Sequence, residues 1–486
     1  MNLKIEHIFK ARSIAIFGAS DEFGKVGTLI MNNLVSCDYQ GKVYPINPKH
    51  AGKKFFDYQV YADLEDVPDK VDFAVIVVPK QFVNETIKKC IEHNIQSAIV
   101  VPAGYAEVDE DGKKMQSELV KMAENGNFIF MGPNSMGVWS SEVSMNINMG
   151  YMSPEPGDVT IISQSGSMGV LVCSNLMRRK IGIRAFVSSG NEACLTFEDY
   201  LHYFINDEKT KIIGTFLETF RKNKEFFEIC KMNLKSNSPK PIIILKAGST
   251  NAGRRAAISH TGSISGSDKI FEGFIKQYGI IRAYNYDQLI NLISGFKCIS
   301  SLPIGNRVAI IPGAGGAGVL LADACEKLGL NVAKPSEELL EKVNKYMPSY
   351  WSHNNPFDPA GSQDFRVYTN TLKLIYKSGE YDCVITNAVE LESILGLYNP
   401  KNETALNAKE KMLEFARPAT QELASNEIKL IKKYEIPTIF VSDVYPYSNI
   451  FDIFNENKIL VVRDPDNAAF VLSEMFKFNK IIKAQN

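Results

Sequence analysis

One histidine stands in a stretch whose residue types suit phosphoryl transfer. His260 lies between the small residues 256–259 and the turn Thr261-Gly262-Ser263, ahead of a helix expected over residues 269–278. A near-neutral imidazole is a competent nucleophile toward an activated phosphoryl group, and the turn can donate hydrogen bonds to an oxyanion. The alternative is a lone histidine without chemistry, and no neighbouring Cys or second His indicates a metal site.

A serine-rich loop offers a second anchor for such chemistry. Ser165-Gly166-Ser167 follows an expected strand at residues 159–162 and opens an apolar-periodic helix that runs to about residue 179. Small hydroxyl residues at a helix start present unpaired N–H groups and the positive end of the helix dipole to an anion. These three residues are therefore predicted phosphate ligands, and the alternative is a serine N-cap that binds nothing.

A carboxylate that could serve the histidine ends another expected strand. Glu218 follows residues 212–217. Carboxylates commonly hold a catalytic imidazole in the required tautomer and stabilise its charged form, so Glu218 is the predicted partner of His260. Otherwise it is a surface acid at a strand end.

The elements that must position these residues are short apolar runs separated by helical patterns. In the first third they occupy residues 13–17, 43–46, 73–78, 97–101 and 128–131. Such runs, bounded by Gly, Pro and Asn, are typical of buried parallel strands in a doubly wound sheet. Ligands of such sheets bind at the carboxyl ends of the strands.

The turn after the first strand has an unusual glycine spacing. Residues 18–27 read GASDEFGKVG before a helix expected over residues 28–34, which departs from the dinucleotide pattern G-x-G-x-x-G. An NAD site needs an acidic residue after the second strand, but Lys49 stands there. A lysine suits a phosphorylated ribose, as in NADP or coenzyme A, unless it is a solvated turn residue.

Taken together, these motifs resemble the succinyl-CoA synthetase superfamily, and more narrowly the α subunit of NDP-forming acyl-CoA synthetases. The resemblance rests on residues 18–20 and 24–27, on VYPINPK at 43–49, on DFAVIVVP at 72–79, on GPNSMG at 132–137 and on SHTG at 259–262. It follows the order of motifs along nearly the whole chain.

The resemblance implies a role for each motif. The first domain would bind CoA rather than a nicotinamide, through Gly18, Ala19, Ser20, Gly24, Lys25, Gly27, Asn47, Lys49, Val78, Pro79 and Asn134. His260 would become the phosphohistidine, with Glu218 beside it and with Ser165, Gly166, Ser167, Thr261 and Gly262 on the phosphate. Gly190 and Asn191 match a loop near the acyl group, although a tight turn also explains the glycine. Where the family usually has glycine after the glutamate, this chain has Thr219.

The predicted fold class is α/β, with a Rossmann-like CoA-binding domain followed by two flavodoxin-like domains. We expect the domains at residues 1–138, 150–300 and 303–486, since the chain of 486 residues is too long for one core. The glycine-rich run at residues 313–318 could cradle phosphate ahead of a helix expected from Val319, but no Lys-Ser/Thr follows it, which favours close helix–sheet packing. Residues 399–427 have a polar helical pattern that indicates a surface insertion or lid.

The composition and charge of the chain indicate which classes of partner it has. Lys and Arg total 54 against 55 Asp and Glu, so no global field favours nucleic acid or an anionic membrane. Eight scattered cysteines without C-x-x-C spacing, and no apolar signal or spanning segment, predict a cytoplasmic protein. No ATP-grasp domain is recognisable, so ADP or ATP with Mg²⁺ is expected on a β subunit, which is the most specific partner implied, in an α2β2 heterotetramer.

The predicted function is that of an acid–thiol ligase subunit which interconverts acyl-CoA, ADP and phosphate with acid, CoA and ATP. The small carboxylic acid itself is not identifiable from one sequence. Two alternatives stay open: a catalytically silent CoA-binding regulatory protein, and an NADP-dependent dehydrogenase built on the first domain.

Overall fold

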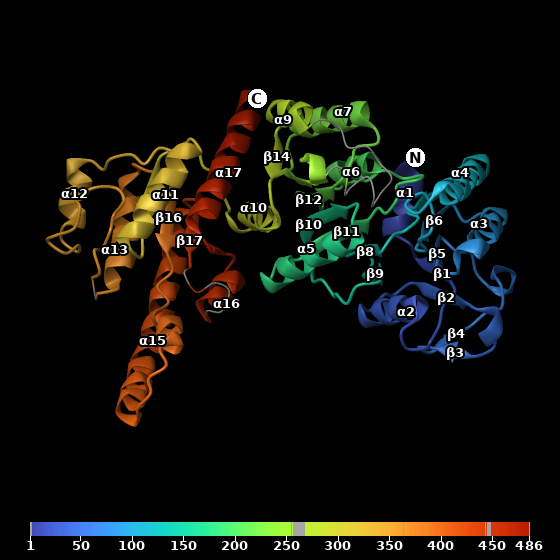
Figure 1. The fold of residues 1–486 in the computed structure, drawn as a ribbon, viewed down its shortest axis with the longest axis horizontal. Coiled ribbons are helices and arrows are strands. Elements are labelled where there is room, and N and C mark those ends of the chain that lie inside the picture. The colour runs from blue at the N-terminus through green and yellow to red at the C-terminus, as the bar shows by residue number, and fades with distance from the viewer. Residues whose placement is uncertain are drawn as a thin grey trace. The chain divides into compact units, whose positions relative to one another are not determined.

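The computed structural model describes residues 2–253, 255, 268–362, 364–442, 444 and 449–485. The chain folds into two compact units, residues 1–289 and 290–486, and the boundary falls within helix α10 (Tyr286–Cys298) (Figure 1). The first unit contains the first predicted domain and nearly all of the second. The division at residues 1–138, 150–300 and 303–486 therefore stays a prediction.

The first sheet has five parallel strands in the order β2-β1-β5-β6-β7. Their bounds are Ser13–Phe17 (β1), Lys42–Ile46 (β2), Phe73–Ile76 (β5), Ser97–Val100 (β6) and Ile129–Met131 (β7). Every residue of β1 and β5 is buried, which is why these strands read as apolar runs. The strand order reverses between β1 and β5, so a ligand site is expected at their carboxyl ends.

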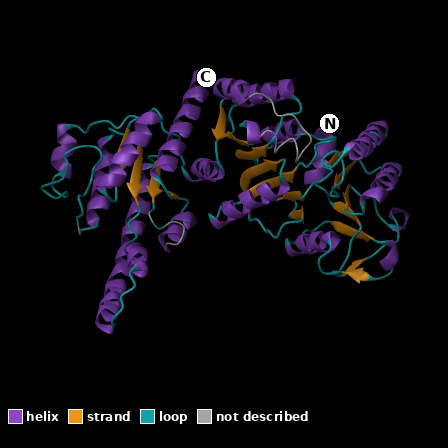
Figure 2. Ribbon diagram, viewed as in Figure 1, coloured by secondary structure: helices purple, strands orange, loops and turns teal. Residues whose placement is uncertain are grey.

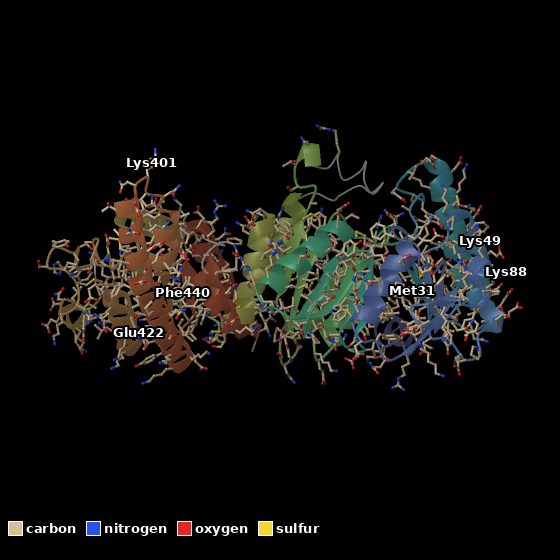
Figure 3. All side chains as sticks on the ribbon, turned by 90° about the horizontal axis from the view of Figure 1, so that it is seen from below. Met31, Lys49, Lys88, Lys401, Glu422 and Phe440 are labelled. Atoms are coloured by element: carbon tan, nitrogen blue, oxygen red, sulfur yellow. The ribbon has the colours of Figure 1, made fainter. Side chains whose placement is uncertain are left out.

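Helices connect these strands and cover the sheet (Figure 2). Helix α1 spans Asn2–Phe9, and α2 (Val26–Ser36), α3 (Val83–Glu92) and α4 (Glu110–Asn125) follow β1, β5 and β6. A two-stranded hairpin, β3 (Lys54–Phe55) with β4 (Tyr58–Gln59), follows β2. Met31 of α2 is buried, whereas Lys49 and Lys88 are exposed at the surface (Figure 3).

The second sheet has seven strands in the order β14-β13-β12-β10-β11-β8-β9. The five parallel strands are Pro156–Ser163 (β10), Ile183–Ser188 (β11), Ile212–Leu217 (β12), Ile242–Lys246 (β13) and Ile280–Ala283 (β14). Helices α5 (Gly166–Arg178), α6 (Phe197–Asn206), α7 (Asn223–Leu234) and α9 (Asp268–Tyr278) belong to this layer. The order of its parallel strands reverses between β10 and β12. We call such a reversal a switch point: the first lies between β1 and β5, and this is the second.

Two antiparallel edge strands of this sheet were missing from the sequence analysis. β8 (Gly137–Ser140) pairs with β11, and β9 (Met145–Asn148) pairs with β8. Their buried polar residues Asn146 and Asn148 hide the strand pattern, because buried asparagines break an apolar run. They also join the sheets: Asn33 of α2 donates to the carbonyls of Asn148 and Gly150 at 2.8 and 3.0 Å.

The two sheets of the first unit share one hydrophobic core. Ile14 and Val75 of the first sheet belong to the same buried cluster as Ile162 and Val187 of the second. A continuous core explains why the first two predicted domains form a single compact unit, since separate domains each bury their own core.

The second unit contains a four-stranded parallel sheet in the order β15-β16-β17-β18. The strands are Val308–Ile311 (β15), Cys383–Asn387 (β16), Thr438–Val441 (β17) and Leu460–Val462 (β18). The helices that accompany them are α11 (Gly315–Lys327), α12 (Glu337–Val343), α13 (Arg366–Ser378), α14 (Leu391–Leu397), α15 (Glu403–Tyr434), α16 (Asn449–Glu456) and α17 (Pro465–Gln485).

Helix α15 replaces the insertion predicted over residues 399–427. Its first half is largely exposed, but Ala416, Leu423 and Ala424 are buried and pack into the core of the unit. The polar pattern therefore describes only the first half of the segment, and the second half is part of the domain itself.

Helix α15 contains a buried acid in its second half. Glu427 is 1% exposed, and neither carboxyl oxygen has a hydrogen-bond partner within the part of the chain that the structure describes. Burial raises the pKa of Glu427 to about 8. Because this pKa exceeds that of an unfolded glutamate, the folded state holds the proton more tightly, and stability falls as pH rises from about 4.5 to 8.

We expect Glu427→Met to raise the free energy of unfolding at pH 8 by about 1–3 kcal/mol, because the methionine buries a similar volume without polar oxygens. The gain should shrink toward pH 5, because the carboxyl is neutral in the folded state there, and the free energy of protonating the mostly ionised carboxyl of the unfolded state is much smaller than at pH 8. Denaturant unfolding of the full chain at both pH values measures this, with the exposed Glu422→Met on the same helix as control (Figure 3). A loss of stability at pH 8 would contradict the prediction.

No helix among the described residues is long and apolar enough to cross a membrane. All eight cysteines are free. Over the same described ranges, no cluster of three or more His, Cys, Asp or Glu side chains is arranged to hold a metal ion.

Candidate active site

A pocket of about 700 Å³ lies at the carboxyl ends of β1, β2 and β5, at the first switch point. It includes eight of the residues predicted to bind CoA: Gly18, Ser20, Lys25, Gly27, Asn47, Lys49, Val78 and Pro79. Ala19 is buried behind the turn, where its carbonyl accepts a hydrogen bond from Asn47 at 2.9 Å. Gly24 is exposed in the same turn, and Asn134 lies elsewhere, in the loop after β7.

Two glycines let the turn close tightly over this pocket. A Cβ at Gly27 would lie 2.3 Å from the carbonyl oxygen of Gly18. Gly18 has a φ of +86°, and a Cβ there would lie 3.1 Å from the backbone of Val77. The glycines are therefore required by close backbone approach, although their spacing differs from the dinucleotide pattern.

The pocket lining carries both signs of charge: the lysines Lys25, Lys49 and Lys89 stand with the acids Glu22, Asp63 and Glu85. Lys25 is the N-cap of α2 and makes no side-chain capping bond, so the helix start faces the pocket with its own N–H groups. The side chain of Lys49 is exposed, and its backbone N–H donates to Asn47 Oδ1 at 3.1 Å. Lys89 instead pairs with Asp63 at 2.5 Å across the pocket wall, and this contact lowers the pKa of Asp63 despite partial burial.

The second switch point is organised by Gln164, directly after β10. Its Oε1 accepts the backbone N–H groups of Glu218 and Thr219 at 2.6 and 2.9 Å, and its Nε2 donates to the carbonyl of Thr219 and to Glu192 Oε2, both at 2.8 Å. One amide thus ties together the ends of β10 and β12 and the loop after β11.

The predicted phosphate loop follows Gln164 at the start of α5. Ser165 is the N-cap and makes no side-chain capping bond, Gly166 is half-buried and Ser167 is exposed. A Cβ at Gly166 would lie 2.5 Å from Met136, which explains the glycine. The first N–H groups of a helix have no acceptor within the helix, and the Ser165 and Ser167 hydroxyls lie 3.4 Å from each other. The phosphate-binding role of these residues stays a prediction.

Glu218 lies at the end of β12, beside this loop. Its side chain is buried, and its carbonyl accepts a hydrogen bond from Lys246 Nζ at 2.6 Å. Lys246 is the last residue of β13, so the chain leaves the sheet next to Glu218 and continues toward the histidine segment. His260, Thr261 and Gly262 themselves lie outside the described residues, and their predicted roles stay predictions.

The structure brings Asn134, Gly190 and Asn191 together, although the sequence analysis assigns them to different sites. Asn134 donates to Asn191 Oδ1 at 3.3 Å, and Asn191 Nδ2 donates to Glu107 and Gln116 at 2.5 and 3.0 Å. A Cβ at Gly190 would lie 2.3 Å from the carbonyl oxygen of Pro133. These contacts join the two sheets of the unit, and the ligand roles of the three residues stay predictions.

Glu192, in the same loop, is a buried acid. It accepts hydrogen bonds from Ser189 Oγ and Gln164 Nε2, each at 2.8 Å. Burial, reinforced by the charge of Glu198, raises the pKa of Glu192 to about 8. The group is therefore largely protonated near neutral pH.

Comparisons with known proteins match this layout. Residues 12–140 match a family described as CoA binding domain, residues 156–296 the succinyl-CoA ligase like flavodoxin domain, and residues 308–389 the ligase-CoA domain. The α subunit of acetate–CoA ligase [ADP-forming] I from Pyrococcus furiosus is 33% identical over 98% of this chain and 98% of its own length. The chain belongs to the family of ADP-forming acetate–CoA ligase α subunits. It is an acid–thiol ligase subunit with a CoA-binding domain.

Other relatives of this ligase subunit carry names of the same enzyme class. The ADP-forming acetate–CoA ligase of Methanocaldococcus jannaschii is 37% identical to this chain. The match covers 74% of this chain and 49% of that protein. Among solved structures, the dinucleotide forming acetyl-coenzyme A synthetase 1 of Ca. Korarchaeum cryptofilum, in complex with phosphate and ADP, has a TM-score of 0.85. The two chains are 29% identical, and the match covers 99% of this chain and 98% of the other.

The departure at Thr219 in this ligase subunit has a structural explanation. Thr219 is not among the residues with positive φ, and both of its backbone polar groups bond to Gln164. Because the turn after Glu218 does not use a left-handed conformation, it does not require glycine.

The residues that sequence reasoning missed act through distant partners. Gln164 and Glu192 lie in the segments at residues 163–169 and 189–193, where the sequence predicts no role for either of them. Lys246 at the second switch point, and Asp63 and Lys89 at the first, carry no motif of their own. The signal that could have found Gln164 is its position, directly after a strand at a predicted switch point.

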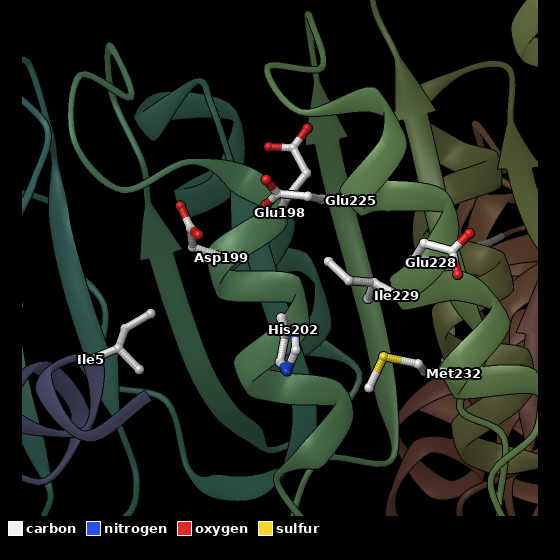
Figure 4. A pocket seen from close by; sticks show the side chains of 8 residues that line it. All are labelled: Ile5, Glu198, Asp199, His202, Glu225, Glu228, Ile229 and Met232. Atoms are coloured by element: carbon white, nitrogen blue, oxygen red, sulfur yellow. The ribbon is translucent and has the colours of Figure 1, made fainter. Parts of the chain in front are cut away.

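The ligase subunit has a further pocket of about 310 Å³ between α6 and α7, shown in Figure 4. Four acids line it: Glu198, Asp199, Glu225 and Glu228. Each already has a basic side chain or backbone N–H as partner, since Lys222 pairs with Asp199 and Glu225, Lys231 with Glu228, and the N–H groups of residues 221 and 222 with Glu198. Because each acid of the pocket already has such a partner, we assign the pocket no ligand.

The glycine-rich run at residues 313–318 shows close packing at two of its positions. A Cβ at Gly313 would lie 2.5 Å from the Asn387 amide, and one at Gly318 would lie 3.0 Å from Pro312. Helix α11 begins at Gly315 rather than at Val319, where the sequence analysis expects it. Close approach therefore accounts for these two glycines without a bound phosphate.

Proposed function

We propose that this chain is the α subunit of an NDP-forming acyl-CoA synthetase, which acts with an ATP-grasp β subunit in an α2β2 heterotetramer. The observation that carries the proposal is the pairing, within one compact unit, of a CoA-type pocket at the first switch point with an uncapped helix start and a buried carboxylate at the second. The first site suits the thioester's CoA, and the second suits phosphate.

The reaction proceeds in three balanced steps. Inorganic phosphate attacks the thioester carbonyl, the C–S bond breaks, and acyl phosphate and CoA thiol result. His260 then attacks the phosphorus of the acyl phosphate, so that the carboxylate leaves and a phosphohistidine forms. Finally the phosphoryl group passes to ADP, which Mg²⁺ accompanies on the β subunit, and ATP is released.

The residues of this chain have distinct tasks in these steps. Lys25, Lys49 and the start of α2 hold the phosphates of CoA. Ser165, Gly166 and Ser167 neutralise phosphate at the start of α5, together with Thr261 and Gly262. Glu218 orients the imidazole of His260 and stabilises its cationic form during transfer.

The proposal also concerns the partner subunit and the carboxylic acid substrate. Some relatives are named as α subunits, which means that they act with another subunit. Relatives are named for acetate, for 4-hydroxybutyrate and for trans-ferulate, so we assign the acid only as a carboxylic acid. The eight free cysteines agree with a cytoplasmic enzyme.

Phosphorylation of the chain tests this function. With Mg²⁺, ATP and a candidate ATP-grasp partner, we expect acid-labile phosphate on wild type and on His353→Ala, which changes another, exposed histidine. His260→Ala should carry none. Equal labelling of wild type and His260→Ala would refute the mechanism, and CoA binding without any labelling would favour the silent regulatory alternative.

A further inference from the structure

We propose that Glu192 is a positioning residue which, through Gln164, locks the strand end that carries Glu218 to the helix start that carries Ser165. The inference rests on the proposed function and extends it, because it adds a residue that does not touch the reacting groups. Three features carry it: the contacts of Gln164, the backbone of Glu192 and the groups that face Glu192.

The side-chain amide of Gln164 accepts two hydrogen bonds and donates two, and these bonds fix its orientation. Its side-chain oxygen accepts hydrogen bonds from two backbone N–H groups, and its amide nitrogen donates to one carbonyl and one carboxyl oxygen. A flipped amide would set its nitrogen against two N–H donors, so the network admits one orientation. The Glu192 contact is the only one of these four that comes from a side chain, and it fixes the amide from outside the β12 turn.

The backbone presents Glu192 in a costly conformation. Glu192 has a φ of +56°, in the left-handed region that non-glycine residues seldom adopt, and it follows Gly190 at a φ of +64°. Such a conformation persists only where surrounding contacts determine it. An outlier of this kind, beside two proposed phosphate-handling groups, points to a functional reason for placing a carboxyl group there.

Glu192 has two hydrogen-bonding states that the geometry accommodates. As an anion it accepts from Ser189 and Gln164. As an acid it can donate its proton to Ser189 Oγ, 2.8 Å from Oε1, while the Ser189 hydroxyl turns to the carbonyl of Ser163 at 3.4 Å. In both states Oε2 still accepts from Gln164, but the bond is charge-assisted only when Glu192 is ionised.

Among the described residues, three titratable or charged groups interact with Glu192. Glu198 and Tyr200 come from α6, and Arg221 comes from the loop after β12, where its Nε lies 3.6 Å from Glu192 Oε2. Burial and Glu198 favour the neutral form, whereas Arg221 favours the anion, and the pKa of Glu192 is raised to about 8. The hydrogen bond to Gln164 therefore strengthens as pH rises through about 8.

The test compares Glu192→Gln, Glu192→Leu and Gln164→Leu with wild type and with Glu228→Leu, an exposed acid on α7. Glu192→Gln mimics the neutral acid, so we expect phosphorylation rates within about threefold of wild type at pH 7 and about three- to tenfold lower above about pH 9. Glu192→Leu and Gln164→Leu should lower kcat more than about tenfold at both pH values, with the KM for CoA within about twofold.

A second readout does not depend on turnover. Hydrogen exchange of the Glu218 and Thr219 N–H groups should be at least about tenfold faster in Glu192→Leu and Gln164→Leu than in wild type, while β1 at the CoA pocket is unchanged. Absence of phosphorylation in wild type would remove the proposed function, and the exchange rates alone would then decide whether Glu192 positions the strand end. Unchanged exchange in both leucine variants, or a pH profile of Glu192→Gln identical to wild type, would overturn the inference.

Discussion

Glu218→Gln is expected to lower the rate of phosphorylation of the chain, and of the overall reaction, by about a hundredfold or more. The amide keeps the size of the side chain but not the charge that stabilises a cationic imidazole, and replacing the carboxylate beside a catalytic histidine costs about 10²–10⁴-fold in comparable arrangements. The fold should tolerate the change, because Gln164 and Lys246 hold Glu218 through its backbone N–H and carbonyl.

The measurement is the initial rate of acid-labile labelling, together with kcat and the KM for CoA. Glu225→Gln, an exposed carboxyl on the adjacent helix α7, is the matched control and should behave as wild type. CoA affinity should not change in Glu218→Gln, since the pocket at the first switch point does not include it. A rate within about threefold of wild type would remove Glu218 from the mechanism.

Gly27→Ala should reduce CoA affinity by about thirtyfold or more. The new Cβ would lie 2.3 Å from the Gly18 carbonyl oxygen and 3.1 Å from the backbone of Ala19 and Ser20. Gly18 is held in place, because its N–H donates to the carbonyl of Ile46 at 3.0 Å. The turn that lines the pocket must therefore shift, at a cost of about 1–3 kcal/mol, where about 1.4 kcal/mol corresponds to a factor of ten in affinity.

Calorimetric titration with CoA measures the loss. Gly273→Ala in α9 is the control, because a Cβ there meets no atom within 4 Å, and alanine favours a helix more than glycine does. Thermal unfolding of both variants separates a local effect on the pocket from a general loss of stability. Wild-type affinity in Gly27→Ala would show that the turn does not contact CoA.

The structure combines two switch points of the same kind in one unit. Each lies where the order of parallel strands reverses, and each presents a helix start, that of α2 or α5, next to a neighbouring strand end. The shared core and the contacts of Asn191 join the two layers, so the CoA pocket and the phosphate loop are parts of one body. The proposed reaction, in which phosphate attacks an acyl-CoA thioester and the phosphoryl group of the resulting acyl phosphate passes to His260, uses both sites.

The buried strands, and the residues that stand at their ends, could be predicted from the amino-acid sequence. Apolar runs such as residues 13–17 and 212–217 coincide with β1 and β12, because strands covered on both faces need no polar positions. For the same reason Glu218, Ser165 and the Gly18 turn could be assigned to strand ends from the order of residues alone. Strand order could only be inferred from the resemblance, since parallel pairing depends on how connections cross.

The pairing of distant polar groups could be seen only in the folded structure. Gln164 and Glu192 lie 28 residues apart, and Lys89 reaches Asp63 over 26 residues, without any spacing that marks the pairs. The buried asparagines of β9 have the polar pattern of a loop, and the contact of this strand with the first layer, from Asn33 of α2 to the carbonyl of Asn148, spans 115 residues. A buried polar group is stable only with its partner in place, and that partner is brought by the packing of distant segments rather than by neighbours along the chain.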